Sequence, residues 1–226
     1  MKKSVLVIGG YGDIGRSIST RFSKLYNVTS TKREELDLSS NRSIESFLEN
    51  SQTKFEHIIF CAAENSPKLF LESEFSDIEK SIQINFLSIT RILHSLSKKN
   101  LINHGGTVTI ISSLYSYFGR LKRLPYSVSK HALSGLVKNL ALELSTYKIR
   151  VNSVSPGYID TKLTRKNLNK NEIEDIKNCI PSGFLGSPDD IGNIVFFLSS
   201  ENGQYINGQD IIADGGFSIG GFMGLE

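Results

Sequence analysis

A tyrosine and a lysine four positions apart, Tyr126 and Lys130, are the residues of this sequence best suited to move a proton. On a helix, this spacing places both side chains on one face. A phenol ionises near pH 10, and an ammonium roughly 5 Å away favours the phenolate by about 3 kcal/mol at an effective dielectric near 20. This corresponds to about 2 pKa units. We therefore expect Lys130 to lower the Tyr126 pKa into the range of acid–base catalysis.

The same spacing occurs a second time in Tyr158 and Lys162, so the pair alone is weak evidence. Context favours the first pair. Tyr126 begins a long apolar segment that predicts a helix, and Ser113 lies before it at the end of a predicted strand. Tyr158 follows a Pro-Gly pair that predicts a loop, where Lys162 need not share its face. We predict that Tyr126 is catalytic, with Ser113 and Lys130 beside it.

A glycine-rich loop follows the first apolar segment of the chain. Gly10, Gly12 and Gly15 satisfy the GxGxxG pattern, in which glycines permit a tight turn and close approach to a pyrophosphate at a helix N-terminus. The alternative is a purely structural turn. The acidic side chain in this loop would repel a phosphate, so we expect Asp13 to serve as the helix N-cap and point away from the ligand.

Apolar segments alternate with amphipathic ones along the whole chain. The predicted strands are 5–8, 28–31, 36–38, 57–61, 107–111, 150–154 and 210–213, with a turn at 104–106. The predicted helices are 14–25, 43–48, 78–96, 126–144 and 189–198. This alternation predicts the α/β class, as one Rossmann-like, doubly wound parallel sheet. Such sheets bind ligands at the carboxyl ends of their strands.

Bulk composition narrows the function further. The 226 residues suit one domain, taken as 1–226, and 39% of them are hydrophobic. A net charge of +3 does not demand a nucleic-acid partner, and no apolar segment is long enough to span a membrane. Cys61 and Cys179 provide neither a disulfide framework nor metal-ligand spacing. We expect no metal and a reduced, cytoplasmic setting.

Seven segments together resemble the single-domain short-chain dehydrogenases/reductases, in particular the 3-oxoacyl carrier-protein reductases. The segments are 9–15, 111–113, 126–130, 151–157, 186–191, 206–209 and 214–216. Their joint occurrence in this order is more specific than any one motif. The resemblance implies an NAD(P)-dependent oxidoreductase that transfers hydride between a nicotinamide and a carbonyl or secondary alcohol.

The resemblance also implies roles for the catalytic residues. Tyr126 exchanges a proton with the substrate oxygen, and Ser113 hydrogen-bonds the substrate carbonyl. Lys130 lowers the tyrosine pKa and holds the nicotinamide ribose. Asn85 supports a water-linked proton relay.

A longer set of residues is predicted to bind the cofactor. Asp37 would contact the adenine amino group, Ile159 the carboxamide and Thr161 a phosphate. The full predicted set is Gly9, Gly10, Tyr11, Gly12, Asp13, Ile14, Gly15, Lys32, Arg33, Asp37, Leu38, Ala62, Ala63, Asn85, Tyr126, Lys130, Pro156, Gly157, Ile159 and Thr161.

The end of the second predicted strand favours NADP(H) over NAD(H). An acidic residue there would repel a 2′-phosphate, whereas Lys32 and Arg33 could donate charge-assisted hydrogen bonds to it. Glu34 and Glu35 follow at once, so a one-residue error in placing the strand end would bring Glu34 closer to this position.

The sequence says less about the substrate and the assembly. Residues 114–118 and 158–178 are expected to line the pocket, with 163–177 as a lid. The basic side chains of 120–123 are interpreted as a solvated loop, although they could attract an anionic carrier or a phosphorylated sugar. The apolar, glycine-rich segment 215–225 predicts a subunit interface, and the resemblance implies a homodimer or homotetramer.

One departure from the family pattern bears on stability. The family's Asn-Asn-Ala-Gly after the central strand reads Cys61-Ala62-Ala63-Glu64 here, which removes side chains that brace that strand. Two other functions remain open. A sugar-nucleotide dehydratase or epimerase shares the glycine loop and the Tyr/Lys pair, but usually has a larger C-terminal domain. A non-catalytic dinucleotide sensor would need none of the four catalytic residues.

Overall fold

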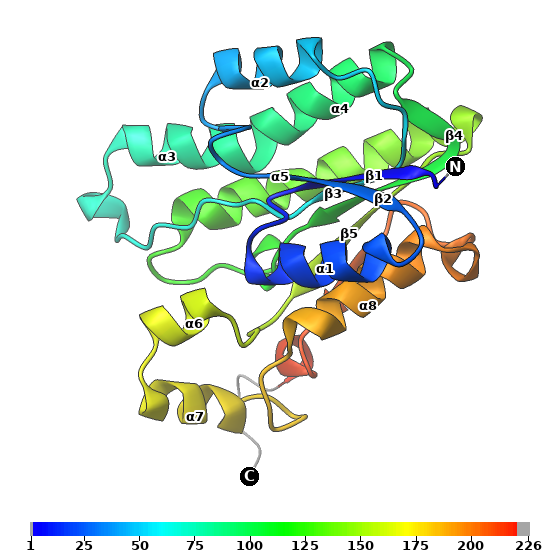
Figure 1. The fold of residues 1–226 in the computed structure, drawn as a ribbon. Coiled ribbons are helices and arrows are strands. Elements are labelled where there is room, and N and C mark those ends of the chain that lie inside the picture. The colour runs from blue at the N-terminus through cyan, green and yellow to red at the C-terminus, as the bar shows by residue number, and fades with distance from the viewer. Residues whose placement is uncertain (1, 221–226) are drawn as a thin grey trace.

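Residues 2–220, which the computed structural model describes, build one sheet of six parallel strands (Figure 1). The strands are β1 (Ser4–Ile8), β2 (Asn27–Thr31), β3 (Phe55–Phe60), β4 (Ile102–Ile111), β5 (Arg150–Pro156) and β6 (Asp210–Ala213). Their spatial order is β2-β1-β3-β4-β5-β6. The direction of winding reverses between β1 and β3, which is where a doubly wound sheet opens a ligand crevice. The predicted fold class is confirmed.

Helices cover both faces of the sheet (Figure 1). One face carries α2 (Asn41–Glu49), α3 (Phe75–Ile82), α4 (Ser88–Lys98) and α5 (Leu124–Glu143), and the other carries α1 (Asp13–Ser23) and α8 (Pro188–Ser199). Two short helices, α6 (Lys162–Asn167) and α7 (Lys170–Asn178), follow β5 and lie away from the sheet. Short 3₁₀ turns occur at Phe70–Glu72, Leu114–Ser116, Ser145–Tyr147, Glu201–Gly203 and Phe217–Ile219.

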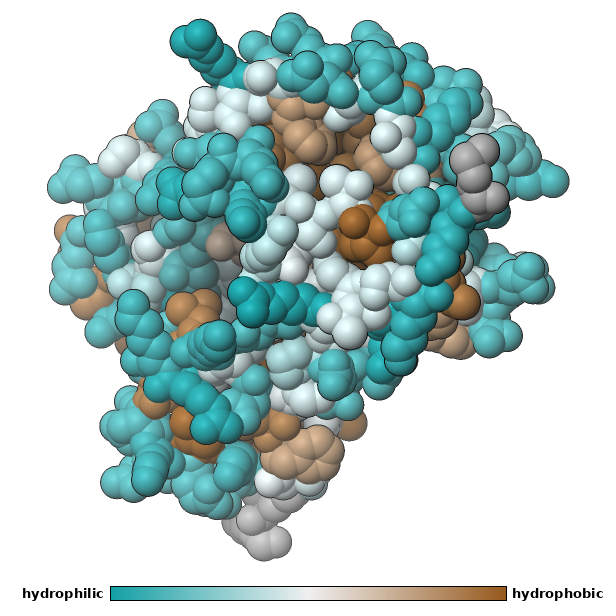
Figure 2. Space-filling model, in the orientation of Figure 1, coloured by the Kyte–Doolittle hydropathy of each residue, from teal (hydrophilic) through white to brown (hydrophobic). Residues whose placement is uncertain are grey.

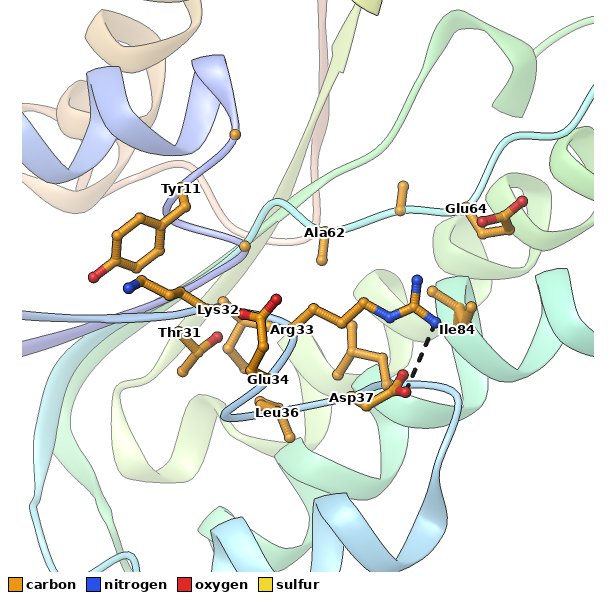
Figure 3. A pocket seen from close by; sticks show the side chains of 15 residues that line it. Tyr11, Thr31, Lys32, Arg33, Glu34, Leu36, Asp37, Ala62, Glu64 and Ile84 are labelled. Atoms are coloured by element: carbon orange, nitrogen blue, oxygen red, sulfur yellow. Dashed lines mark ion pairs between the residues drawn. The ribbon is translucent and has the colours of Figure 1, made fainter.

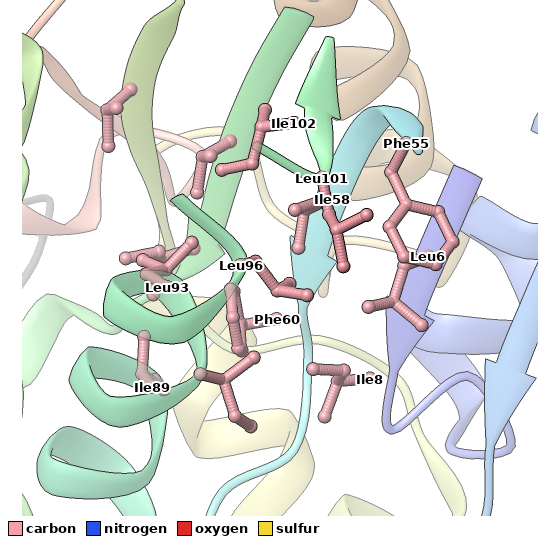
Figure 4. Packing of buried hydrophobic residues seen from close by; sticks show 14 of the residues in the cluster. Leu6, Ile8, Phe55, Ile58, Phe60, Ile89, Leu93, Leu96, Leu101 and Ile102 are labelled. Atoms are coloured by element: carbon pink, nitrogen blue, oxygen red, sulfur yellow. The ribbon is translucent and has the colours of Figure 1, made fainter. Parts of the chain in front are cut away.

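The central strands are buried because helices cover both faces of the sheet there, and their sequences are correspondingly rich in apolar residues. On the face of α4, strand residues pack against one side of that helix (Figure 4). The contributing side chains include Leu6, Ile8, Ile58 and Phe60 from the strands and Ile89, Leu93 and Leu96 from α4. Burial of these side chains holds the carboxyl ends of β1, β3 and β4 side by side.

The predicted helix 78–96 is a longer, interrupted unit. Between α3 and α4 the chain forms a π-helical turn, η2 (Gln83–Leu87), and the buried Asn85 lies within it. A π-turn inserts an extra residue into the helical turn and often marks a functional site.

Two further predicted elements differ from the structure. Residues 36–38, which the structure describes, form no strand: Leu36 and Leu38 are buried, but Asp37 accepts hydrogen bonds from the Ser39 backbone and hydroxyl and so makes a turn. The predicted turn 104–106 lies inside the longer β4, where Gly105 adopts a φ of +80°. The register jumps there from Phe55↔Ile102 to His57↔Thr107, so a bulge absorbs the extra residues.

Candidate active site

Three neighbouring cavities lie at the carboxyl ends of the strands. Their volumes are about 430, 660 and 220 Å³, and we call them the adenosine, central and distal cavities. Gly9, Tyr11, Gly12 and Ala62 line both of the first two, so these two are continuous. The surface in Figure 2 is hydrophilic over most of its area, with paler atoms at its centre.

The glycine loop leaves no room for side chains. Gly9 has a φ of +80°, and a Cβ there would lie 2.6 Å from the Ala62 nitrogen. A Cβ on Gly15 would lie 2.3 Å from the Gly9 carbonyl oxygen. Gly12 begins α1 without a side-chain cap, so the first N–H groups of the helix are open to an anion. These features fit a dinucleotide pyrophosphate.

The expectation that Asp13 is the N-cap of the first helix was wrong. Gly12, not Asp13, is the N-cap of α1, and Asp13 is the first helical residue. Its carboxylate accepts a hydrogen bond of 2.7 Å from the Lys162 backbone nitrogen, at the start of α6. Asp13 thus ties α6 to the glycine loop, because a carboxylate is stabilised at a helix N-terminus.

The adenosine cavity carries the predicted basic pair (Figure 3). The Lys32 ammonium lies 4.9 Å from the Tyr11 ring centroid. Arg33 extends towards Asp37, with 3.8 Å between Nη2 and Oδ2. Glu34 also lines the cavity. The hydrogen bonds from Ser39 hold the pKa of Asp37 below its ordinary value, with a smaller contribution from Arg33, so this carboxylate is ionised at the cavity wall.

The three predicted catalytic residues meet in the central cavity. Ser113 follows β4, while Tyr126 and Lys130 lie on α5. The Lys130 Nζ is 5.5 Å from the Tyr126 ring centroid and donates a 2.9 Å hydrogen bond to the Ile111 carbonyl. Ser113 and Tyr126 also line the distal cavity, so they stand where the two cavities join.

The sequence argument predicted a lowered pKa for Tyr126, and this prediction was wrong for the protein chain without bound molecules. Burial raises the pKa of the phenol above its ordinary value, and the Ser113 hydroxyl and the Arg123 charge offset only part of this. Burial also lowers the pKa of Lys130 to about 8. The sequence argument counted charge attraction and left out the cost of burying a phenolate.

Asn85 is fully buried and braces the segment after β3. Its Oδ1 accepts from the Glu64 nitrogen at 2.7 Å, and its Nδ2 donates to the Glu64 carbonyl at 2.9 Å and to the Ser129 hydroxyl at 2.9 Å. These bonds connect the segment after β3 with η2 and α5. They also supply bracing at the position where the sequence departs from the family pattern.

The segment after β5 forms the far wall of the central cavity. Pro156, Gly157, Ile159 and Thr161 all line it. Ile159 is buried and bridges to Gly186, and the Thr161 hydroxyl caps α6 by accepting from the Thr164 nitrogen.

Most predicted cofactor residues line one of the first two cavities, but Gly10 and Asn85 line neither. A Cβ on Gly10 would lie 2.5 Å from the Ser30 hydroxyl, so this glycine permits the loop to pack on β2. Sequence reasoning missed Thr31, Asn65 and Arg16, which also line the cavities. Thr31 could have been found, since it ends a predicted strand.

Arg120 and Lys122 are exposed, as the interpretation of 120–123 as a solvated loop expects, but two side chains of this loop also border a cavity. Arg120 and Arg123 line the distal cavity, whereas Lys122 does not. The loop reaches this cavity because it joins Ser113 to Tyr126, which both line it. The predicted lid contains α6 and α7, and Leu163, Asn167 and Ile176 from these helices line the same cavity.

Residues 2–220 offer neither a metal centre nor a reactive thiol beside these cavities. This part of the chain has no group of three or more His, Cys, Asp or Glu residues placed to hold a metal, and no helix in it is long and apolar enough to cross a membrane. Cys61 borders the central cavity, but burial raises the pKa of its thiol to about 12, so it is not a thiolate nucleophile.

Comparisons with known proteins agree with this geometry. A family model described as Enoyl-(Acyl carrier protein) reductase matches residues 11–218. The 3-oxoacyl-(acyl-carrier-protein) reductase FabG of Aquifex aeolicus is 30% identical over 216 residues, which cover 94% of this chain and 86% of the relative. Its counterpart from Rickettsia felis is 32% identical over 232 residues, with coverages of 95% and 96%. A solved structure described as a 4-hydroxyisoleucine dehydrogenase mutant complexed with NADH and succinate has a TM-score of 0.89 at 26% identity, covering 96% of this chain and 99% of that one.

The chain therefore belongs to the short-chain dehydrogenase/reductase family. Within that family it is a nicotinamide-dependent oxidoreductase that transfers hydride between the cofactor and its substrate.

Proposed function

We propose that the protein reduces a carbonyl group with NADPH, with Tyr126 as the acid that protonates the nascent alcohol. One observation carries the proposal: Ser113 and Tyr126 line both the central and the distal cavity. Here a carbonyl in the distal cavity would face a nicotinamide in the central one. When bound, the reduced nicotinamide supplies a hydride to the carbonyl carbon.

The chain's own residues manage the oxygen and its proton. The Ser113 hydroxyl donates a hydrogen bond to the substrate oxygen and fixes its position. As the carbonyl π electrons move to that oxygen, the Tyr126 phenol gives it a proton. A raised phenol pKa suits this direction, because the acid is fully protonated at neutral pH. Lys130 holds the nicotinamide ribose and compensates the phenolate that is left.

Asn85 acts through its neighbours in this scheme. Its amide holds Ser129, one turn from Tyr126, and it connects the π-turn with α5. We propose that this arrangement supports a water-linked path that returns the proton to Tyr126.

The preference for NADP(H) over NAD(H) rests on Lys32 and Arg33, both in the adenosine cavity. Lys32 has no carboxylate partner among the described ion pairs, and the Arg33 partner is 3.8 Å away. Both cations could therefore turn to a 2′-phosphate. Glu34 opposes this preference from the same cavity. The remaining predicted contacts belong to the same proposal: Asp37 with the adenine amino group, Ile159 with the carboxamide and Thr161 with a phosphate.

The proposal extends to the setting of the protein. The printed chain, 1–226, acts as one catalytic domain on a small-molecule carbonyl or alcohol. It assembles as a homodimer or homotetramer in the cytoplasm, without a nucleic-acid or membrane partner. Two free cysteines support a reducing compartment.

Replacement of Tyr126 tests the proposal. Tyr126→Phe should lower kcat by more than 100-fold, since the ring remains but the proton donor is lost. Cofactor binding, measured by quenching of nicotinamide fluorescence, should change by less than about threefold. Tyr158→Phe should cost far less than Tyr126→Phe. A Tyr126→Phe enzyme that kept a tenth of the wild-type kcat, or a reversed ranking of the two variants, would contradict the assignment.

A further inference from the structure

The distal cavity has an unbalanced positive charge. Among the residues that line it are two arginines, Arg120 and Arg123, and no aspartate or glutamate. Neither arginine has an ion-pair partner among the described residues 2–220. A cavity of about 220 Å³ that also contains Ser113 and Tyr126 therefore combines a site for reduction with uncompensated cations.

Aromatic side chains hold Arg120 at this cavity. Its guanidinium carbon lies 5.8 Å from the Tyr115 ring centroid and 5.7 Å from that of Tyr158. Its Nη1 donates a hydrogen bond to the Tyr158 hydroxyl. The Tyr115 ring is in turn 6.1 Å from the Tyr126 ring. The Tyr115 ring thus contacts Arg120 on one side and lies near Tyr126, the proposed proton donor, on the other.

Arg123 also has a neutral hydrogen-bond partner, but no aromatic ring of the described residues lies against its guanidinium. Its Nη1 donates a 2.7 Å hydrogen bond to the Asn65 side chain, which connects it to the segment after β3. A guanidinium has five N–H donors in a planar fork that matches a carboxylate. The Arg120 fork, held by two rings, is pre-oriented for such a partner, and orientation reduces the entropy lost on binding.

We propose that the substrate is a small oxo acid, and that Arg120 binds its carboxylate while Ser113 and Tyr126 receive its ketone. This proposal rests on the carbonyl reduction proposed above. Arg120 and Tyr126 line the same small cavity, with the Tyr115 ring between them, so an acid that reaches both residues within this volume must be short. A phosphate at the far end of a long acyl carrier would lie outside such a space. Tyr158 is a positioning residue, because it acts through Arg120.

The test compares straight-chain oxo acids of five or six carbons, with the ketone at C2, C3 or C4, and their methyl esters. Each acid–ester pair shares the reacting group and differs in one charge. Wild-type kcat/KM should favour the acid by about tenfold or more, as a charge-assisted hydrogen bond predicts. In Arg120→Gln, the acid-to-ester ratio should fall by about the same factor, mainly through KM. Arg120→Lys, which keeps the charge, should recover part of the ratio.

Lys122→Gln is the matched control. Lys122 lies in the same loop and carries the same charge, but it does not line the cavity. The acid-to-ester ratio of this variant should stay within about twofold of wild type. Tyr158→Phe should lower the ratio less than Arg120→Gln, since the aromatic ring remains beneath the guanidinium.

Reduction of acetoacetyl-CoA shows whether Arg120 binds the carboxylate of a small acid or a phosphate of an acyl carrier. If its reduction depends on Arg120 while that of the acids does not, the anion is a carrier phosphate and the proposal is overturned. An unchanged ratio in Arg120→Gln, or a wild-type preference for the esters, overturns it as well.

A binding measurement separates this proposal from the proposed function. Calorimetry follows the same acids titrated into protein saturated with NADP⁺. If no ketone is reduced, the proposed function fails. Binding of the acids that is lost in Arg120→Gln would still support the carboxylate site, whereas no binding at about 10 mM acid would overturn it.

Discussion

Tyr126 and Lys130 show how burial changes the chemistry of a residue pair. Both are in the central cavity, where the charged form of each is disfavoured: the phenol pKa rises and the ammonium pKa falls to about 8. The phenol therefore keeps its proton in the neutral range, as a donor in ketone reduction requires. The aromatic neighbours of Arg120 act differently, since they hold a side chain whose charge is not lost at any relevant pH.

The cofactor preference is decided by two residues and has its own prediction. The double variant Lys32→Ala, Arg33→Ala should lose about tenfold or more in kcat/KM for NADPH, because charge-assisted contacts to the 2′-phosphate disappear. Its kcat/KM for NADH should change by less than about threefold. The measurement is steady-state kinetics with both cofactors and one accepted ketone.

The control for the Lys32→Ala, Arg33→Ala variant removes two positive charges at positions outside the cavities. Lys54 and Lys138 are exposed and do not line a described cavity. Lys54→Ala, Lys138→Ala should leave the NADPH-to-NADH ratio unchanged. A wild-type preference for NADH, or equal losses with both cofactors, would mean that Glu34 sets the preference instead.

At the scale of elements, the π-turn and the segment after β3 depend on one side chain. Asn85→Ala should lower the free energy of unfolding by about 1–3 kcal/mol, because the part-buried Glu64 N–H and C=O lose their hydrogen-bond partner. Urea denaturation measures this loss. Asn139→Ala is the matched control: Asn139 is exposed on α5 and bonds only its own helix, at the Gly135 carbonyl, so its loss should stay within about 0.5 kcal/mol. Equal losses of unfolding free energy in the two variants would contradict the bracing role of Asn85.

The contact between the sheet and helices α1 and α8 predicts a pH dependence. His57 on β3 is buried against Phe22 and Tyr26, and burial lowers its pKa from 6.5 to about 4. The unfolded chain therefore binds the proton first, and stability falls as pH drops below 6.5. The loss from this residue should be about 1.5 kcal/mol between pH 6.5 and 5.

Variants isolate that contribution. His57→Gln, neutral at every pH, should lack this part of the slope in urea titrations at several pH values, whatever its stability at pH 7.5. The exposed His94 is the control, and His94→Gln should keep the wild-type slope. Parallel curves for wild type and His57→Gln would show that His57 does not titrate differently on folding.

At the scale of the whole molecule, the apolar surface around the C-terminal part suggests assembly. Brown atoms gather at the lower end of Figure 2, in the region where Figure 1 shows α6 and α7. Leu163, Phe184 and Ile219 are among the exposed large hydrophobic residues, and Ile219 is 88% exposed. The predicted interface segment 215–225 extends past the described part of the chain, since residues 221–225 lie outside it.

Truncation tests this predicted interface. Deletion of the last eight residues, 219–226, should shift the assembly towards smaller species in light scattering, because apolar surface that subunits cover would be lost. The melting temperature should fall with it, as expected when subunit association stabilises the fold. An unchanged mass together with an unchanged melting temperature would contradict the proposal.

The sequence alone determined the class of fold and most of the cofactor cleft. Periodicity located the strands and helices because their apolar faces must be buried. The glycine loop was recognisable because close backbone packing excludes side chains there. Ser113, Tyr126 and Lys130 were predictable as a group, since Ser113 follows the carboxyl end of a predicted strand and helical spacing places Tyr126 and Lys130 on one face.

The tertiary structure decided what depends on surroundings. The directions of the Tyr126 and Lys130 pKa values follow from burial, which spacing along the chain does not reveal. Residues 36–38 have an apolar pattern typical of a strand, yet the Asp37 side chain turns the backbone instead. The partner of Asp13 is 149 positions away in the chain. Arg120 joins the distal cavity only because two tyrosines from different segments meet around it. Contacts between distant segments depend on how the whole chain packs, so these features could not be read from local sequence.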